Sequence, residues 1–390
     1  MSNSKKKPKK TLSYSQKLEC RRTLYQKVAA EGRRNLFYFS KHILGYDKLI
    51  ERIHGGWCKK LQELGKPGKK SKLLLLVAKD HYKSTVATVS YILWRLVQKN
   101  GRDMRAIIGN AVLGKSQSFL REIKWQIEKN EVFRSCYGDY MELADKWTEK
   151  TLVVQREKPI KEPTIEATAE GIGMASQHPD VMIFDDWVNE KNSVTQAALE
   201  GGIESFKKVL AARTDDSVVI VVGHCFHFAD LYNYLQNDAE DRSEWDIIYQ
   251  PAEDKDGVVL FPEKFGANGN KLREKEREVG TVYYNAYYRL DPSGFKGQIL
   301  KYEWLKLYEE GAVPPGLTIY QANDLATGED KTKNDYFVNL TIGVDRQGIV
   351  WLLNILRERI PFPDQYQAVK NQWRAWGPVG IAIESNAYQI

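Results

Sequence analysis

The feature that most constrains the fold is an apolar run that stops at a short polar loop, LLLLVAKDHYKST in residues 73–85. After this loop, apolar residues return at helical spacing through residues 86–97. A buried strand, a loop and a helix that opens on Lys-Ser can bind nucleotide phosphates, because loop amides and the helix N-terminus stabilise negative charge. Lys83 would reach the outer phosphates, and the hydroxyl of Ser84 would hold Mg²⁺.

The loop departs from the standard phosphate-binding pattern, which has glycine at its first and sixth positions and lysine at its seventh. Counted back from Lys83, these two positions hold Val77 and Tyr82. A lysine followed by Ser-Thr at a helix start is also typical of an ordinary capped turn exposed to solvent. The loop alone therefore leaves both interpretations open.

A second segment with chemical character is an apolar strand that ends in two adjacent acids. In residues 178–188, HPDVMIFDDWV, Asp185 and Asp186 follow four apolar residues. A carboxylate at the end of a parallel strand lies where such sheets bind ligands. Asp185 would hold Mg²⁺ through water, and Asp186 would orient or deprotonate the attacking water. The alternative is a loop that only caps the next helix, but the pair and the Lys83 segment together favour a nucleotide site.

A third segment, VVIVVGHCFHFADLYNYL in residues 218–235, contains a strand, a glycine turn and two histidines. His224 and His227 are candidates for two ligands of a zinc ion, but no further ligands lie near them in the sequence. A polar residue after a central strand can instead sense the γ-phosphate and pass its loss to a neighbouring domain. The alternative is a polar turn that satisfies local backbone groups.

Length and composition limit the classes of protein to consider. A chain of 390 residues indicates two domains, or one domain with an appendage. The net charge of +7 suits a polyanionic partner, and part of it lies in the first ten residues, which predict a solubilising tail or a binding arm. The longest apolar runs stay below the roughly 18 residues of a membrane-spanning helix. The four cysteines are scattered, which favours reduced thiols over disulfides or zinc: Cys20, Cys58, Cys136 and Cys225.

Strands alternate with helices from residue 73 to residue 222, which predicts a parallel sheet covered on both faces. Residues 251–315 are rich in proline, glycine and charge, with a helix expected near 271–279, and are expected to form a linker or subdomain that packs between two units. From residue 317 the predicted elements are strands at 318–322, 336–344 and 349–354, a helix at 363–373 and a strand at 380–383. This order resembles the front half of an RNase H-like fold. The expected division is 1–36 (basic tail and helix), 37–250 (α/β domain with the candidate nucleotide segments), 251–315 (linker or subdomain) and 316–390 (RNase H-like domain with its front half only).

Four segments occur in the order AKDHYKST, GIGMASQHPDVMIFDD, GHCFHFADL and a stretch from PAEDKDGVVLFPEKF to YYNAYYRLDP. From about residue 37 to the last residue, the chain resembles the large subunit of tailed-phage terminases, the ATP-driven motor and nuclease that packages viral DNA. The resemblance implies an α/β fold, in which a P-loop NTPase-like domain with a parallel-rich sheet precedes a partial RNase H-like nuclease domain.

The resemblance also assigns roles to residues of the ATPase domain. It implies that Lys83 is the phosphate lysine, Ser84 the Mg²⁺ hydroxyl, Asp185 the Walker B acid and Asp186 the catalytic carboxylate. The residues that would bind ATP are Lys79, Asp80, His81, Tyr82, Lys83, Ser84, Thr85 and His224. Lys79 stands where relatives carry a basic finger, although lysine offers a point charge in place of the fork of arginine. Tyr82 in place of glycine restricts the loop, and His224 replaces the usual threonine of the coupling segment.

For the nuclease domain, the resemblance implies that Asp324 and Glu384 hold two Mg²⁺ or Mn²⁺ ions, which would activate water against a phosphodiester. The alternatives are that Asp324 is an aspartate in a turn and that Glu384 is a charge at the N-terminus of a helix. Asp335 matches a further acidic position, and Asp345 is expected in a hairpin turn. The family has a third acid beyond the position of Ile390, so we expect weak ATP hydrolysis and poor DNA cleavage from this chain.

The expected function is a motor that moves viral double-stranded DNA into the procapsid, with binding that weakens steeply with salt. The implied partners are the terminase small subunit, the portal protein and further copies in a ring. The expected location is the host cytoplasm, with transient docking on the procapsid and no membrane. Two alternatives stay open: a helicase-like nucleic-acid-dependent ATPase, which needs a second helicase-type domain after residue 317, and an inactive DNA-binding prophage remnant.

Overall fold

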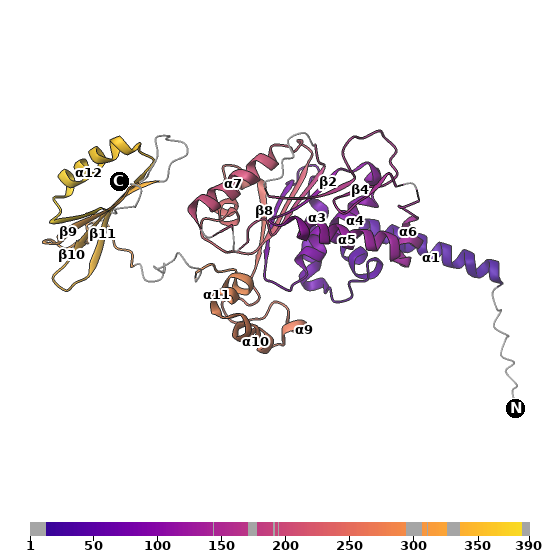
Figure 1. The fold of residues 1–390 in the computed structure, drawn as a ribbon. Helices are drawn as coiled ribbons and strands as arrows, with labels where there is room; N and C mark the ends of the chain where they lie inside the picture. Colours follow the sequence, from indigo (N-terminus) through magenta and orange to yellow (C-terminus); the bar gives the residue numbers. More distant parts are fainter. Residues whose placement is uncertain are drawn as a thin grey trace, which may run out of the picture. The chain divides into compact units, whose positions relative to one another are not determined.

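The computed structural model describes residues 13–142, 144–170, 178–189, 192–193, 195–293, 306–309, 311–325 and 336–383. Contacts within the chain divide it into two compact units, Met1–Leu300 and Lys301–Ile390. Figure 1 shows the elements of each unit. In the described part of the chain, every helix is too short or too polar to cross a membrane.

The first unit is built on an eight-stranded sheet with the order β3-β4-β5-β2-β6-β7-β1-β8. The strands are β1 (Lys72–Val77), β2 (Ala106–Asn110), β3 (Lys146–Trp147), β4 (Thr151–Val153), β5 (Ile165–Ala169), β6 (Val181–Asp185), β7 (Val218–Gly223) and β8 (Trp245–Gln250). The six strands from β5 to β8 in this order pair in parallel, whereas β3 and β4 pair antiparallel. The prediction of a parallel-rich sheet is therefore confirmed.

Helices cover both faces of this sheet, which explains why its central strands are continuous apolar runs. Successive side chains of a strand point to opposite faces. Accordingly, Leu73 and Leu75 of β1 belong to one apolar core, whereas Leu74 and Leu76 belong to a second core on the other face. Each fully buried leucine contributes roughly 1.5–3 kcal/mol to folding, so the run also anchors the loop that follows it.

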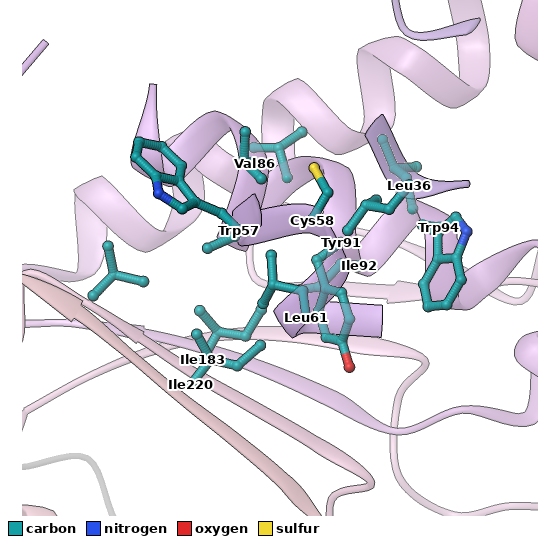
Figure 2. Packing of buried hydrophobic residues seen from close by; sticks show 14 of the residues in the cluster. Leu36, Trp57, Cys58, Leu61, Val86, Tyr91, Ile92, Trp94, Ile183 and Ile220 are labelled. Carbon is teal, nitrogen blue, oxygen red and sulfur yellow. The ribbon is translucent and has the colours of Figure 1, made fainter. Parts of the chain in front are cut away.

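The first core lies under helices that come before and after β1. Figure 2 shows residues of α3 (Gly56–Glu63) and α4 (Tyr91–Leu96), such as Trp57 and Ile92, close to Ile183 and Ile220 of the sheet. The other elements that contribute to it include α2 (Leu36–Tyr38), η1 (Phe39–Ile43), η2 (Glu51–Gly55), η3 (Thr85–Ser90), α5 (Leu113–Lys129) and α6 (Glu131–Tyr137). Helix α1 (Tyr14–Arg34) precedes them and begins with a capping box at Ser13.

The second core lies under α7 (Gln196–Leu210), α8 (Leu231–Asn233) and η5 (Tyr234–Asp238). Two short turns, η4 (Gly101–Asp103) and η6 (Arg242–Glu244), complete the connections between the strands. All four cysteines are free thiols, and two of them are buried.

Residues 251–293, part of the expected linker or subdomain, are largely helical. They form α9 (Pro262–Phe265), α10 (Asn270–Val279), α11 (Thr281–Tyr284) and η7 (Asn285–Arg289). Their aromatic side chains, with Leu272, are buried in the same core as β1: Phe261, Phe265, Tyr284 and Tyr288. This segment is therefore an integral part of the first unit, and the boundary between the units falls at residue 300.

The second unit contains β9 (Thr318–Asp324), β10 (Phe337–Val344), β11 (Val350–Glu358), α12 (Phe362–Trp376) and β12 (Gly380–Ile383). The sheet order is β11-β10-β9-β12, with β12 parallel to β9 and the other pairs antiparallel. The predicted strands and helix are confirmed, although β11 continues to Glu358 because its last residues still pair with β10. Asp345 lies in the hairpin turn, where its carboxylate accepts hydrogen bonds from the backbone of Gln347 and Ile349.

Candidate nucleotide-binding site

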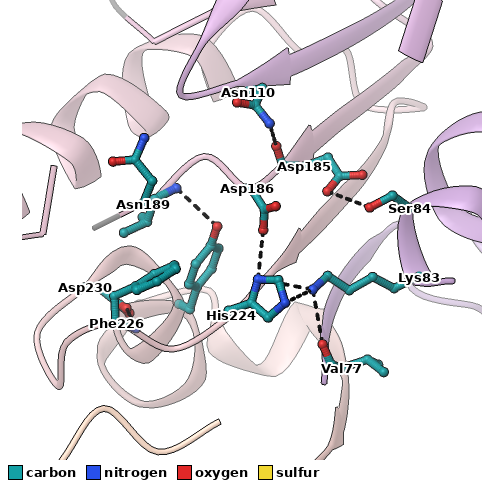
Figure 3. Close-up of polar contacts among 12 residues, drawn as sticks. Val77, Lys83, Ser84, Asn110, Asp185, Asp186, Asn189, His224, Phe226 and Asp230 are labelled. Atoms are coloured by element: carbon teal, nitrogen blue, oxygen red, sulfur yellow. Dashed lines mark hydrogen bonds and ion pairs between the residues drawn. The ribbon is translucent and has the colours of Figure 1, made fainter. Parts of the chain in front are cut away.

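The strand order brings the three segments that contain Lys83, Asp185 and His224 to one edge of the sheet. Strand β7 lies between β1 and β6, and all three are parallel, so their carboxyl ends point the same way. The loop after β1, Asp185 at the end of β6 and His224 after β7 therefore meet, as Figure 3 shows. These three segments are therefore as close together as a shared nucleotide site requires.

Asp185 is completely buried and is held by two hydroxyl groups. Ser84 Oγ donates to its Oδ1 at 3.1 Å, and Thr88 Oγ1 donates to its Oδ2 at 2.5 Å. Burial and the neighbouring charge of Asp186 raise the pKa of Asp185, and the two hydroxyl groups oppose this only in part. The protein contacts alone do not neutralise the carboxylate charge of Asp185, so this side chain can bind a cation.

Thr88 is a residue that the sequence analysis missed. It lies four positions after Ser84, so the two hydroxyl groups lie on one face of the same helix. This spacing was visible in the sequence. Asn110, at the end of β2, was also missed; its Nδ2 donates to the main-chain oxygen of Asp185 at 2.5 Å.

Lys83 is almost fully buried and points toward the acids. Its Nζ donates to the main-chain oxygen of Val77 at 3.1 Å and to Nε2 of His224 at 2.5 Å. Burial lowers the pKa of Lys83, whereas the charges of Asp186 and Asp185 act in the opposite direction. The Nζ atom of this lysine thus lies at the centre of the site, between the end of β1 and His224.

His224 links this lysine to Asp186. Its Nδ1 lies 3.1 Å from Oδ1 of Asp186. Because Nε2 accepts from the ammonium group, the ring hydrogen is on Nδ1 and is donated to the carboxylate. Burial and the charge of Lys83 lower the pKa of His224 to about 4, so this ring is neutral at pH 7.

Asp186 differs from its buried neighbour because 42% of its side chain is exposed. Its backbone adopts a left-handed conformation with φ of 51°, which aspartate tolerates better than most residues. Although burial acts to raise its pKa, the contact with His224 and the ammonium groups of Lys83 and Lys79 lower it overall. Asp186 is therefore an ionised, accessible carboxylate at neutral pH.

The loop itself offers free hydrogen-bond donors. Three of its carbonyl groups accept from side chains: Lys79 from His81 Nδ1 at 2.8 Å, Asp80 from Lys264 Nζ at 2.5 Å, and His81 from His54 Nε2 at 3.2 Å. By contrast, no hydrogen bond among the described residues uses the backbone N–H groups of residues 80–84. Successive free N–H groups at the start of a helix form a concave anion-binding surface.

The remaining predicted residues of this site have more peripheral places. The ammonium of Lys79 lies 4.2 Å from the ring centre of Tyr287, and Thr85 begins η3. The backbone of His227 donates to Asp230, which also caps α8, so the two residues shape the turn after β7. Within the described ranges, no three His, Cys, Asp or Glu side chains gather as a metal centre made of protein ligands alone would require.

Gly223, the last residue of β7, allows this turn to pack closely. A Cβ atom at this position would overlap the ring of Tyr232, which is fully buried. The hydroxyl of Tyr232 accepts a hydrogen bond from the backbone of Val188 at 3.1 Å, just after the two acids. The ring therefore ties the end of β7 to the end of β6.

Of the predicted nuclease residues, the structure describes Asp324 alone. It closes β9 and is exposed. In the parallel pair of β9 and β12, Ile383 is in register with Asn323, so the two strands end side by side. Glu384 and Asp335 lie outside the described residues, and the predicted acid pair stays a prediction.

His81 provides a pH test of the loop. Burial and the charges of Lys264 and Lys83 lower its pKa to about 4, against about 6.5 in the unfolded chain. The unfolded state then binds more protons between these values, so stability falls as pH drops from 6.5 toward 4. Between pH 7 and pH 5, this group should lower the free energy of unfolding by about 2 kcal/mol. Over the same pH change, the free energy of unfolding of a His81→Gln variant should decrease by about 2 kcal/mol less than that of wild type. Urea unfolding at both pH values measures this difference.

The exposed His178→Gln variant is the control for this measurement and should follow wild type. An unchanged pH dependence in His81→Gln would contradict the buried, neutral state of His81.

The order β8-β1-β7-β6-β2, the loop with its buried lysine and the acid at the end of β6 together define a P-loop NTPase-like α/β fold. No family model matches the chain, and a search of curated proteins found no similar sequence.

Among solved structures, the chain is similar to the large terminase of bacteriophage HK97, with 13% identity and a TM-score of 0.49 over 90% of this chain and 74% of that chain. It is also similar to the large terminase of a thermophilic bacteriophage in complex with ADP, with 10% identity and a TM-score of 0.37 over 85% and 78%. The ATPase domain of the Thermus phage P74-26 large terminase gives 10% identity and a TM-score of 0.41 over 64% and 96%. At these identities the similarity assigns no role to any residue.

Proposed function

We propose that the first unit binds and hydrolyses ATP, as the ATPase of a terminase large subunit. The observation that carries this proposal is the convergence at one sheet edge of Lys83, the Ser84–Asp185 pair and the accessible Asp186. They lie beside a loop whose free N–H groups suit phosphate oxygens. This is the set of groups that phosphoryl transfer to water requires.

Each group has a distinct task in this proposal. The N–H groups of residues 80–84 and the ammonium of Lys83 bind the phosphates. The hydroxyl of Ser84 and the carboxylate of Asp185 would hold Mg²⁺. Both groups suit this ion, because both are hard oxygen donors. When bound, this ion neutralises charge on the phosphates.

Asp186 is the general base. Its ionised carboxylate accepts a proton from water as the water oxygen bonds to the γ-phosphorus and the bond to the bridging oxygen breaks, which releases ADP and phosphate. His224 donates its Nδ1 hydrogen to Asp186 and so fixes the orientation of this carboxylate.

In the same proposal, ATP hydrolysis drives double-stranded DNA into a procapsid. The excess of positive charge and the ordered motifs of the sequence support this role. The proposed partners are the small subunit, the portal protein and further copies in a ring, and the proposed location is the host cytoplasm during docking on the procapsid. The antiparallel pairs of β9, β10 and β11 disfavour the helicase alternative, which needs a second parallel ATPase-type sheet.

The test is phosphate release by the purified chain with ATP and Mg²⁺, with and without linear double-stranded DNA. We expect hydrolysis that EDTA abolishes and that DNA stimulates, and we expect DNA binding to weaken steeply between low and moderate salt. A helicase would also separate the strands of a forked duplex, which a packaging motor would leave intact. Absence of both nucleotide binding and hydrolysis would refute the proposal.

For the second unit we propose a metal-dependent nuclease of RNase H-like fold, with Asp324 and Glu384 as ligands of Mg²⁺ or Mn²⁺. The support is the order β11-β10-β9-β12, which places the end of β12 beside Asp324. We expect weak cleavage of plasmid DNA with Mn²⁺ that is lost in Asp324→Asn and retained in Asp345→Asn, a hairpin carboxylate of the same sheet. Equal cleavage by both variants on an agarose gel would count against this role.

A further inference from the structure

Two residues of the phosphate loop adopt a backbone conformation that favours glycine. Asp80 has φ of 66° and Tyr82 has φ of 60°. Tyr82 stands at the sixth position of the loop, where the standard pattern has glycine. A side chain in the left-handed region costs conformational free energy, so this loop needs contacts that hold it in place.

Such contacts come from the segment that follows β8. Lys264 of α9 donates its Nζ hydrogen to the main-chain oxygen of Asp80 at 2.5 Å. The same ammonium lies 4.5 Å from the ring centre of Tyr82, a cation–π contact. Tyr288 of η7 donates its hydroxyl hydrogen to Oδ2 of Asp80 at 2.8 Å. Lys264 and Tyr288, which we call the loop clamp, thus contact both strained residues.

The surroundings of the clamp also fix the outer side of the loop. His81 stacks on Phe265 with ring centres 5.1 Å apart, and the backbone N–H of Lys79 donates to Tyr287 at 2.8 Å. These contacts use carbonyl groups, side chains and the N–H of Lys79. Among the described residues, they leave the N–H groups of residues 80–84 free.

We propose that Lys264 and Tyr288 are positioning residues that hold this glycine-poor loop in the conformation that binds the phosphates of a nucleoside triphosphate. The inference rests on the proposed function, because the ligand is the nucleotide of the same site. Neither residue touches the phosphates in this proposal; both act through Asp80 and Tyr82. The clamp replaces the freedom of a glycine with tertiary contacts.

The first experiment measures binding of a fluorescent ATP analogue with Mg²⁺ to the full chain and to Lys264→Met. We expect about 10-fold weaker binding, because the loop then has to be ordered at the cost of binding free energy. Tyr288→Phe removes a single hydrogen bond and should weaken binding about 3-fold. The exposed Lys271→Met variant on the neighbouring α10 is the matched control and should bind like wild type.

Rescue separates positioning from general stabilisation. Glycine adopts the conformation of residue 82 without strain, so adding Tyr82→Gly to Lys264→Met should recover most of the lost affinity. A merely structural role predicts the opposite, because the second substitution removes another packed side chain and lowers the melting temperature further. Equal or weaker binding by the double variant would overturn the proposal.

A readout without nucleotide keeps the test independent of the proposed function. Amide hydrogen exchange in residues 79–84 should be about 10-fold faster in Lys264→Met than in wild type and Lys271→Met. If wild type binds no nucleotide but this exchange difference is present, the proposed function fails and the clamp stands. If wild type binds nucleotide and both binding and exchange are unchanged in Lys264→Met, the clamp fails and the proposed function stands.

Discussion

Replacing Lys83 with alanine should lower kcat/KM for ATP by about 100- to 1,000-fold, the usual effect of removing one preorganised group that stabilises transition-state charge. Lys83 is the buried ammonium that contacts both Val77 and His224 at the meeting point of the three strands. Its removal eliminates a positive charge that acts on both acids. The measurement is phosphate release at saturating and subsaturating ATP.

Lys99→Ala, at an exposed position after α4, is the control for the loss of one lysine and should hydrolyse ATP like wild type. Thermal unfolding of each variant shows whether the fold is retained. Equal, background-level rates in wild type and Lys83→Ala would favour the inactive prophage remnant. Equal rates well above background would show that Lys83 is not part of the reaction.

Replacing Asp186 with asparagine should lower kcat by about 100- to 10,000-fold while the affinity for ATP changes by less than about 3-fold. The reason is that Asp186 contacts His224, whereas in the described part of the chain neither Ser84 nor the backbone N–H groups of the loop form a hydrogen bond with it. Asparagine keeps the shape of the side chain but accepts a proton poorly. Single-turnover hydrolysis together with equilibrium binding of the nucleotide separates the two effects.

Asp185→Asn provides the contrast, because this carboxylate shares its site with the hydroxyl of Ser84. That variant should need a higher Mg²⁺ concentration for half-maximal hydrolysis. Asp216→Asn, at an exposed turn before β7, should behave like wild type. A loss of nucleotide affinity in Asp186→Asn as large as its loss of kcat would rule out a role confined to the chemical step.

The strands that position the site could be predicted because each is an apolar run that ends at a polar residue. The position of β7 between β1 and β6 could not, since periodicity reports which residues are buried and not which strands pair. The sequence therefore predicted that Lys83 and Asp185 meet, but not that His224 lies between Lys83 and Asp186. The roles of these residues stay predictions until the variants are measured.

Residues 251–293 show what composition leaves open. Proline, glycine and charge indicated a linker or subdomain, but they did not show that several of its charges pair within the segment. Arg273 pairs with Glu253 and Glu276, and Arg289 lies 3.6 Å from Glu276. Once these charges are paired, the aromatic residues of the same segment can pack beside β1. Such pairs join positions that sequence periodicity does not connect.

The second unit was easier to predict because its strands alternate clearly and its turn has a strong signal at residues 345–348. Its buried polar residues were harder. Asn339 donates to Asn323 at 2.7 Å across the β9–β10 pair, where the two residues are in register. Only the register between strands shows that these two amides satisfy each other.

The overlap between Gly223 and the ring of Tyr232 has an evolutionary consequence. Among homologous chains, position 223 can gain a side chain only where position 232 has become smaller, so substitutions at the two sites should be correlated. Where the tyrosine is lost, the backbone of Val188 loses its hydrogen-bond acceptor and the path of the chain after the acids should diverge as well.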